Sequence, residues 1–172
     1  LSAIQIDIKN PDLSFVTEAD VMKMISSQGV VVRQSIVGAI HTNQLENTIK
    51  ENKWVKDAEI FITANHSMNV RVTQKKPVVR INQNDSIDYA YYLDEYANPI
   101  ELSDQYISKV PIVTAPSLGY VRKDLDFKND LVELSQYLAA DTFWNAMITQ
   151  INVDKDYHIE LIPAIGNHVI LL

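Results

Sequence analysis

Cysteine is absent from the 172-residue sequence, glycine occurs only four times, and no long apolar run is present. Without cysteine the chain has neither disulfides nor thiolate metal ligands, and no redox compartment can be inferred. Four dispersed glycines do not form the clustered loop that cradles a phosphate group, and the G-x-S-x-G turn of serine hydrolases does not occur. No stretch reaches the roughly 20 apolar residues of a membrane-spanning helix, so we expect this part of the chain to be soluble.

Positive charge is also scarce, since 15 Lys and Arg stand against 22 Asp and Glu and the formal net charge is −7. Nucleic acids and anionic lipid surfaces favour clustered Lys and Arg, so this balance argues against both as general partners. The one basic cluster, Lys75, Lys76 and Arg80, is expected to lie solvated at a domain junction. A hydrophobic content of 47% is enough for a packed core, in one large domain or two small ones.

Side chains suited to catalysis or metal binding are few and dispersed. No histidine has a second histidine three or four residues away, the spacing that places two ligands on one helical face; the four are His41, His66, His158 and His168. Three carboxylate pairs lie in predicted turns, where Asp is favoured for its hydrogen bonds to the backbone: Asp85 with Asp88, Asp94 with Glu95, and Asp154 with Asp156. We therefore expect no catalytic, cofactor-binding or metal-binding residues, and we interpret the chain as non-enzymatic.

The first part of the chain has the pattern of a strand, two helices and two further strands. Apolar residues alternate over Ala3–Lys9, and Thr17–Gln28 is predicted as a helix with a capping box at its start and Gly29 as its stop. A second helix begins at Thr42 and places Leu45 and Ile49 on its buried face. Two strands follow. Val55, Ala58, Ile60 and Ile62 lie in a strand-like run, and after a turn at Asn65–His66 the apolar residues Met68, Val70 and Val72 alternate in the return strand.

The second part begins after a polar, turn-rich segment, Asn82–Asp88, near which we place a domain boundary. Strands are predicted at Tyr89–Asp94 and Val110–Thr114, and a helix from about Asp126 carries leucines at helical spacing. Asp141 is placed to cap a further short helix. Three strands are then predicted over Ile148–Val153, Tyr157–Ile162 and Asn167–Leu172.

Short motifs occur along the chain in an order that resembles one family. They are Asn52-Lys53-Trp54-Val55, where the family has proline at the second position, Gln74-Lys75-Lys76-Pro77-Val78-Val79, Tyr91–Glu95, Pro99–Ser103 and Val110–Val113. This order is similar to the bacterial cell-division proteins FtsQ (DivIB), in the version found in Bacteroidetes-like bacteria. The resemblance implies an α+β fold with a POTRA-like β-α-α-β-β domain over residues 1–81 and a β domain over residues 82–172, truncated at its C-terminus.

The resemblance also implies a function. FtsQ-type proteins are divisome scaffolds on the periplasmic face of the inner membrane, anchored by an upstream helix that this sequence lacks. Their POTRA domain contacts earlier division proteins, and their β domain binds FtsB- and FtsL-like partners and so influences septal peptidoglycan synthesis. No cofactor, nucleic acid or small-molecule substrate is implied.

The candidate binding residues come from the edges of the expected sheets. In POTRA sheets the third strand lies between the first and second, so the second strand is an edge to which a partner strand can add. The candidates are Val55, Lys56, Asp57, Ala58, Glu59, Ile60, Phe61 and Ile62, with Asn167, His168, Val169 and Ile170 at a second edge. The resemblance implies that the principal FtsB-binding strand lies beyond Leu172, so truncation would uncover this second edge. Trp54 is expected to pack against the helical layer.

Two other readings stay open at this point. A POTRA module of an outer-membrane assembly or secretion system would fold similarly but would occur in tandem repeats followed by barrel strands. An enzyme domain with an unrecognised site would need an ordered cluster of polar side chains in a cleft.

Overall fold

The computed structural model describes residues 1–83, 86–115, 124–166 and 168–172, and for residues 83 and 86–89 it describes the backbone alone. The chain divides into two compact units, Leu1–Lys75 and Lys76–Leu172. Each unit has its own sheet, so each is described by itself.

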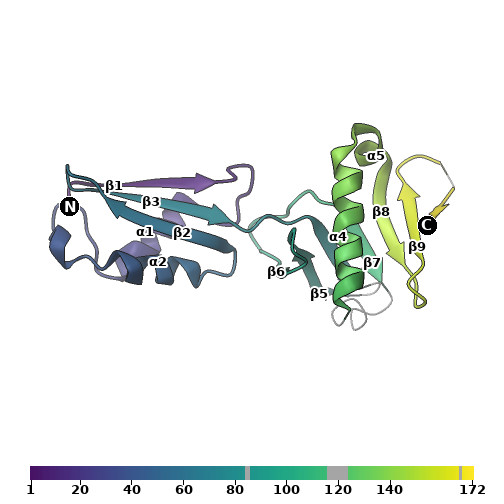
Figure 1. The fold of residues 1–172 in the computed structure, drawn as a ribbon, viewed down its shortest axis with the longest axis horizontal. Coiled ribbons are helices and arrows are strands. Elements are labelled where there is room, and N and C mark those ends of the chain that lie inside the picture. Colours follow the sequence, from purple (N-terminus) through teal and green to yellow (C-terminus); the bar gives the residue numbers. More distant parts are fainter. Residues whose placement is uncertain (84–85, 116–123, 167) are drawn as a thin grey trace. The chain divides into compact units, whose positions relative to one another are not determined.

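The first unit contains a three-stranded sheet in the order β1-β3-β2 (Figure 1). β1 (Ala3–Lys9) pairs in parallel with β3 (Ser67–Gln74), and β2 (Val55–Ile62) pairs antiparallel with β3. The β2–β3 turn contains His66 at φ 61°, a left-handed conformation that turns accommodate. The predicted strands and the central place of the third strand are therefore confirmed.

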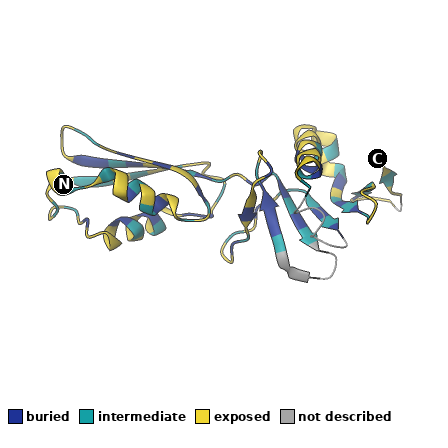
Figure 2. Ribbon diagram, turned by 60° about the horizontal axis from the view of Figure 1, so that its bottom comes forward, coloured by how far each residue is buried: buried dark blue, intermediate teal, exposed yellow. Residues whose placement is uncertain are grey.

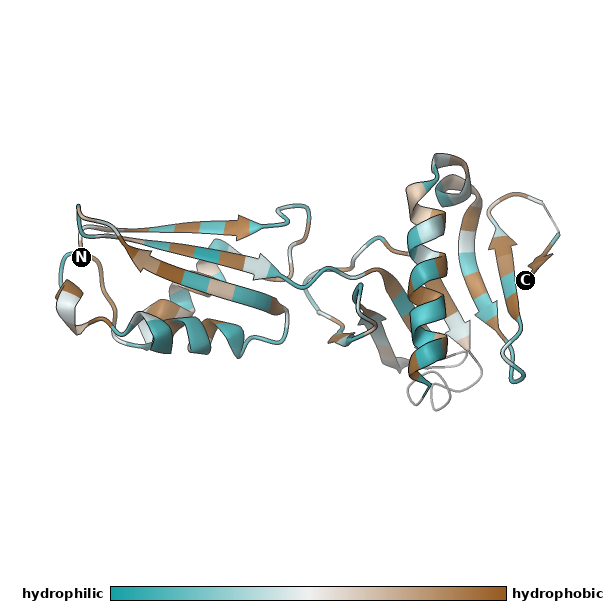
Figure 3. Cartoon of the chain, viewed as in Figure 1, coloured by the Kyte–Doolittle hydropathy of each residue, from teal (hydrophilic) through white to brown (hydrophobic). Residues whose placement is uncertain are grey.

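Two helices, α1 (Glu18–Ser27) and α2 (Thr42–Lys50), lie on the same side of this sheet (Figures 1 and 2). A short 3-10 turn, η1 (Val37–Ala39), lies between them in sequence. The helices bury Val21, Ile25, Leu45 and Ile49 against the apolar face of the strands. Figure 3 shows the corresponding alternation of apolar and polar residues along β2 and β3. The expected three-stranded sheet with a one-sided helical layer is thus present.

The predicted capping box of α1 is formed. Asp20 N–H donates to Thr17 Oγ1 at 3.2 Å, and Thr17 N–H donates to Asp20 Oδ2 at 2.9 Å. The Thr17 hydroxyl also donates to Asp20 Oδ2 at 2.7 Å, and this bond, together with that from Thr17 N–H, lowers the pKa of Asp20 because both favour its ionised form. Gly29 follows the helix at φ 78°, where a side chain would be strained.

Trp54 is half-buried rather than fully buried. Its ring stacks on Phe15, in the segment before α1, with ring centroids 6.4 Å apart, and the Lys53 ammonium lies 4.8 Å from the indole centroid. Replacing a fully buried Trp by Ala lowers the free energy of unfolding by about 3–5 kcal/mol. That value does not apply to Trp54→Ala, because Trp54 is partly exposed to water.

The second unit contains a seven-stranded mixed sheet in the order β10-β9-β8-β7-β4-β5-β6. The strands are β4 (Val79–Gln83), β5 (Ser86–Leu93), β6 (Pro99–Glu101), β7 (Ile112–Ala115), β8 (Ile148–Val153), β9 (Ile159–Pro163) and β10 (Ile170–Leu171). β4 is an interior strand, antiparallel to β5 on one side and parallel to β7 on the other. The short strand β6 was not predicted, because three residues around a proline carry almost no strand signal.

One face of this sheet is covered by α4 (Leu125–Ala140), which is followed by the short helix α5 (Thr142–Met147). The predicted cap of α5 is present, since Asp141 Oδ1 accepts from Phe143 N–H at 2.8 Å and from Trp144 N–H at 3.0 Å. The core between α4 and the strands includes Phe127, Leu131 and Leu138 of the helix and Val79, Ile81, Val113 and Ile151 of the sheet.

The division between the units falls between Lys75 and Lys76, earlier than the expected boundary between residues 81 and 82. Val79 and Ile81 belong to β4 and are fully buried in the second core. The polar segment 82–88 does not separate domains; in the described residues β4 and β5 pair on either side of positions 84–85, with Gln83 opposite Ser86. Of the basic cluster, Lys75 and Lys76 lie at the division as predicted, whereas Arg80 is part of β4.

Candidate partner-binding edges

β2 is an edge strand of the first sheet, as predicted. Its buried side chains are Val55, Ala58 and Ile60, and Ile62 is half-buried. Its exposed side chains are Lys56, Asp57, Glu59 and Phe61. The strand therefore presents polar and aromatic side chains on the face away from the helices, and its backbone on the side away from β3.

The backbone of the β2 edge is partly occupied by carboxylates. Ile60 N–H donates to Glu46 Oε1 of α2 at 2.7 Å, so this N–H points away from β3. Since N–H groups alternate in direction along an antiparallel strand, Ala58 N–H also points outward, and Glu59 N–H points to β3. The Ala58 N–H in turn interacts with the Asp57 carboxylate and helps lower the pKa of Asp57. A partner strand has to displace both carboxylates.

An ion pair lies at the start of the same edge. Lys50 Nζ, at the end of α2, is 2.9 Å from Asp57 Oδ1. The hydrogen bond between them lowers the pKa of Asp57 and raises that of Lys50. Both side chains are about half exposed, so the pair orients Asp57 and adds little to stability.

The second candidate edge is β10, the outermost strand of the seven-stranded sheet. It pairs antiparallel with β9 through Ile170 opposite Leu161 and Leu171 opposite Glu160. Ile170 is half-buried against the core, whereas Leu171 is 72% exposed and Leu172 is 64% exposed. His168 and Val169 are also exposed, and Asn167 lies outside the described residues.

The direction of the β10 backbone follows from one hydrogen bond. Leu172 N–H donates to Ile159 O at 3.0 Å, toward β9. Leu171, one residue earlier, therefore directs its N–H and C=O away from β9. Within the described residues, this strand thus combines outward-directed backbone groups with exposed apolar side chains, the two features that β-augmentation uses.

One turn brings together three possible metal ligands. Ligand atoms of Asp154, Asp156 and His158, between β8 and β9, all lie within 4.8 Å of one another. Asp154 Oδ1 accepts from Asp156 N–H at 2.7 Å and from His158 N–H at 3.0 Å, and Asp154 Oδ2 lies 2.9 Å from His158 Nδ1. The Asp154 carboxylate is therefore engaged in holding the turn, which is the role expected of this acidic pair.

The contact between Asp154 and His158 shifts the pKa of both side chains. The hydrogen bond to Asp154 raises the pKa of His158, and the same bond lowers the pKa of Asp154. Asp94 holds the turn between β5 and β6 in the same manner, since its Oδ1 accepts from Tyr96 N–H at 2.9 Å and from Asn98 N–H at 2.8 Å.

In the part of the chain that the structure describes, no helix has the length and apolar character needed to cross a bilayer.

Comparison with known families gives two adjoining matches. Residues 2–73 match the model of a POTRA-like domain, and residues 76–172 match the model described as FtsQ/DivIB, C-terminal related. The chain belongs to this FtsQ/DivIB-related family. The two matches meet where the two units divide, and together they are typical of a family of cell-division scaffold proteins. A comparison with curated proteins finds no match.

The sequence pattern located both edges of this FtsQ/DivIB-related chain but did not show that a side chain of α2 occupies the β2 edge. Glu46 lies on α2 and reaches β2 only in the folded unit, so no local pattern shows its contact with Ile60. The i, i+4 spacing of Asp154 and His158 is visible in the sequence, but the spacing of histidines from one another does not show it.

Proposed function

We propose that this chain is the extracytoplasmic part of a non-enzymatic division scaffold that binds FtsB- and FtsL-like proteins by strand addition. The β10 edge is one candidate site, and the β2 edge of the POTRA-like unit is a second site for upstream division proteins. The full protein acts at the periplasmic face of the inner membrane, where its partners regulate septal peptidoglycan synthesis.

The exposed β10 edge is the observation that supports the proposal most. Leu171 and Leu172 are largely exposed on a strand whose outer backbone groups face away from β9. The second unit matches an FtsQ/DivIB-related family and not another POTRA repeat, which favours a division scaffold over a module of outer-membrane assembly.

The test at β10 separates backbone from side chain at one position. Leu171→Pro removes an outward N–H without removing a bond to β9, whereas Leu171→Ala keeps the N–H and removes the exposed side chain. In full-length protein we expect Leu171→Pro to abolish co-purification of the FtsB-like partner and to block septation, and Leu171→Ala to weaken both. Normal partner binding by a folded Leu171→Pro protein would show that the β10 edge is not the site.

At β2 the N–H of Ala58 points outward, so Ala58→Pro is the informative substitution. Glu59→Pro removes a hydrogen bond to β3 and is the control that shows how much the domain's own structure is damaged by proline. Ile62→Pro, at the end of the strand, tests the same edge if the ring at position 58 disturbs the core. Loss of recruitment to the division site with either folded variant supports the proposal. Wild-type localisation of both variants would exclude β2 as the recruitment surface.

A further inference from the structure

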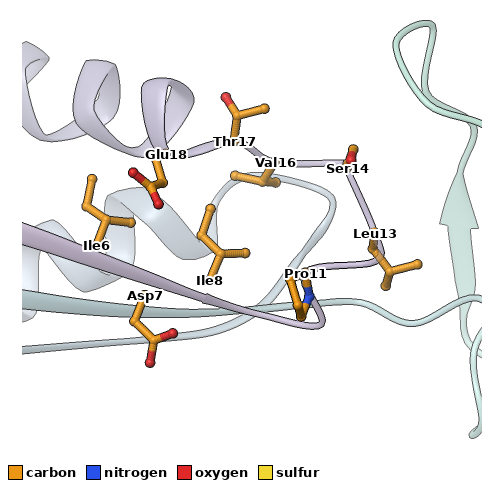
Figure 4. A pocket seen from close by; sticks show the side chains of 9 residues that line it. All are labelled: Ile6, Asp7, Ile8, Pro11, Leu13, Ser14, Val16, Thr17 and Glu18. Atoms are coloured by element: carbon orange, nitrogen blue, oxygen red, sulfur yellow. The ribbon is translucent and has the colours of Figure 1, made fainter.

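A groove of about 330 Å³ runs along β1, on the opposite edge of the first sheet from β2. Its apolar lining comes from Ile6 and Ile8 of β1 and from Pro11, Leu13 and Val16 of the segment that leads to α1. Figure 4 shows Ile6 and Ile8 pointing from β1 toward this segment and toward the start of α1. The groove lies within one unit, and its lining residues are all described.

The groove exists because the helical layer covers the three strands unequally. On the helix-facing side, Met68, Val70 and Val72 of β3 are almost completely buried. Ile4, Ile6 and Ile8 of β1 occupy the same face opposite them, yet all three are only half-buried. An apolar strip therefore remains beside the free edge of β1, where an added strand could bury it.

The backbone of β1 is also more open than that of β2. In the described part of the chain, β1 pairs with β3 alone. No side chain in that part bonds to the backbone of Ala3–Lys9 in the way that Glu46 bonds to Ile60 of β2. Strand addition at β1 therefore displaces none of the described side chains of this unit, whereas addition at β2 has to displace two carboxylates.

The charge of the groove selects the sign of its occupant. The charged residues of its lining are Asp7 and Glu18, and no Lys or Arg is among them. The Asp7 side chain points to the other face of the sheet (Figure 4). There Lys9 Nζ lies 2.7 Å from Asp7 Oδ2, so the negative charge of Asp7 is already compensated. The Glu18 side chain points toward β1 between Ile6 and Ile8, is exposed, and has no ion-pair partner in the described residues (Figure 4).

We propose that the β1 edge and this groove form a third docking site, which takes an extended peptide segment with apolar residues at alternate positions and Lys or Arg between them. The apolar side chains cover Ile6 and Ile8, the segment's backbone pairs with β1, and one cationic side chain meets Glu18. β-Augmentation beside a groove gives affinity through the backbone and specificity through alternate side chains. The proposal rests on the first unit alone and is independent of the partners of β10.

The test is an NMR titration of the 172-residue chain with two eight-residue peptides, acetylated and amidated. One alternates valine with lysine and threonine, and the other has glutamate in place of lysine. We expect the basic peptide to shift the amide signals of Ala3–Lys9 and of residues 11–18, and to bind roughly fivefold more tightly than the acidic peptide, as for one exposed ion pair. Shifts confined to β2 or β10, equal binding of both peptides, or no binding would overturn the proposal.

Three variants make the charge assignment specific. Glu18→Gln should remove the preference for the basic peptide, and Glu18→Lys should reverse it. Glu51→Lys, the same charge change at an exposed residue that follows α2, should leave the preference intact. Concentration-dependent shifts of β1 without any peptide would indicate pairing between copies of this chain and would also overturn the assignment.

Discussion

Gln74 is completely buried at the end of β3, and its side-chain amide holds the segment between β1 and α1. Its Oε1 accepts from Val16 N–H at 2.9 Å, and its Nε2 donates to Leu13 O at 2.8 Å and to Asn10 O at 3.2 Å. A buried amide that satisfies three backbone groups is costly to remove, because each group left unpaired loses about 1–3 kcal/mol. The same segment lines the β1 groove.

We therefore expect Gln74→Leu to lower the free energy of unfolding of the first unit by about 2–4 kcal/mol, since a similar volume is kept while several polar groups lose their partners. Urea denaturation followed by circular dichroism measures this loss. Gln5→Leu, at an exposed position of β1, is the control and should change stability little. Equal losses in the two variants would show that the amide contacts do not matter.

His158 and Asp154 form an exposed pair whose effect is visible in titration. Asp154→Asn should bring the pKa of His158 down toward its ordinary value, because the bond to Asp154 is the largest cause of the rise. Asp156→Asn, which removes a weaker electrostatic contribution, should lower this pKa less. NMR titration of the His158 ring measures both changes, and an unchanged pKa in Asp154→Asn would contradict the pairing.

The sign of the pH dependence follows from the raised pKa of His158. Stabilisation by protonated His158 is complete below the pKa of the unfolded chain, near 6.5, and is lost as the pH rises through the higher folded pKa. The His158 side chain is 70% exposed and that of Asp154 is 46% exposed, so the titration of the ring is a more sensitive measurement than overall stability.

At the scale of elements, α2 protects the edge of β2. Glu46→Ala should remove the acceptor of Ile60 N–H and lower stability by about 1 kcal/mol, as for a half-exposed charge-assisted hydrogen bond. Glu46→Gln keeps an acceptor oxygen and should retain most of that stability. Thermal unfolding of the two variants separates these effects, and equal losses would mean that the helix contact, rather than the bond to Ile60, was disturbed.

Glu46→Ala exposes the backbone N–H of Ile60 and should therefore also make β2 a better template for strand addition. Sedimentation analysis of Glu46→Ala is therefore expected to show more self-association than wild type at high concentration. A strictly unchanged distribution would indicate that β2 stays protected by other groups, such as Asp57.

Elements with strong local signals were predictable from the sequence, and contacts between distant residues were not. The capping box at Thr17, the alternation in β2 and β3, and Asp141 before α5 each depend on neighbours in sequence. The bonds of Gln74 span 58 to 64 residues, so no window of sequence contains both partners. The occupied β2 edge and the β1 groove belong to this second class.

For the whole molecule, the division between the units makes a direct prediction about fragments. Residues 76–172 should fold alone, whereas residues 82–172 should not, because the shorter fragment lacks Val79 and Ile81 from β4, an interior strand of the sheet. Circular dichroism and urea denaturation of the two fragments measure the difference. Equally cooperative unfolding of both would place β4 outside the second unit.

The boundary expected from the sequence, between residues 81 and 82, differs from the observed division between Lys75 and Lys76 for a physical reason. The polar segment 82–88 has the composition of a turn, and composition does not distinguish a turn within a sheet from a linker between domains. The better signal was Pro77, which cannot donate to a ladder and lies next to the observed division. β4 pairs with β5 on one side and with β7 on the other, and this pairing assigns β4 to the second unit.

The parallel pairing of β1 with β3 sets the order in which the first unit can be completed. Ala3 lies opposite Ser67 and Lys9 opposite Thr73, so β1, which is synthesised before the other two strands of this sheet, can pair only after β3 has been made. The β2–β3 hairpin has short loop closure and can form at once, whereas closing the long β1–β3 loop is entropically slower. Until residues near Gln74 emerge, β1 remains an unpaired apolar strand, which is the state in which a chaperone would bind it.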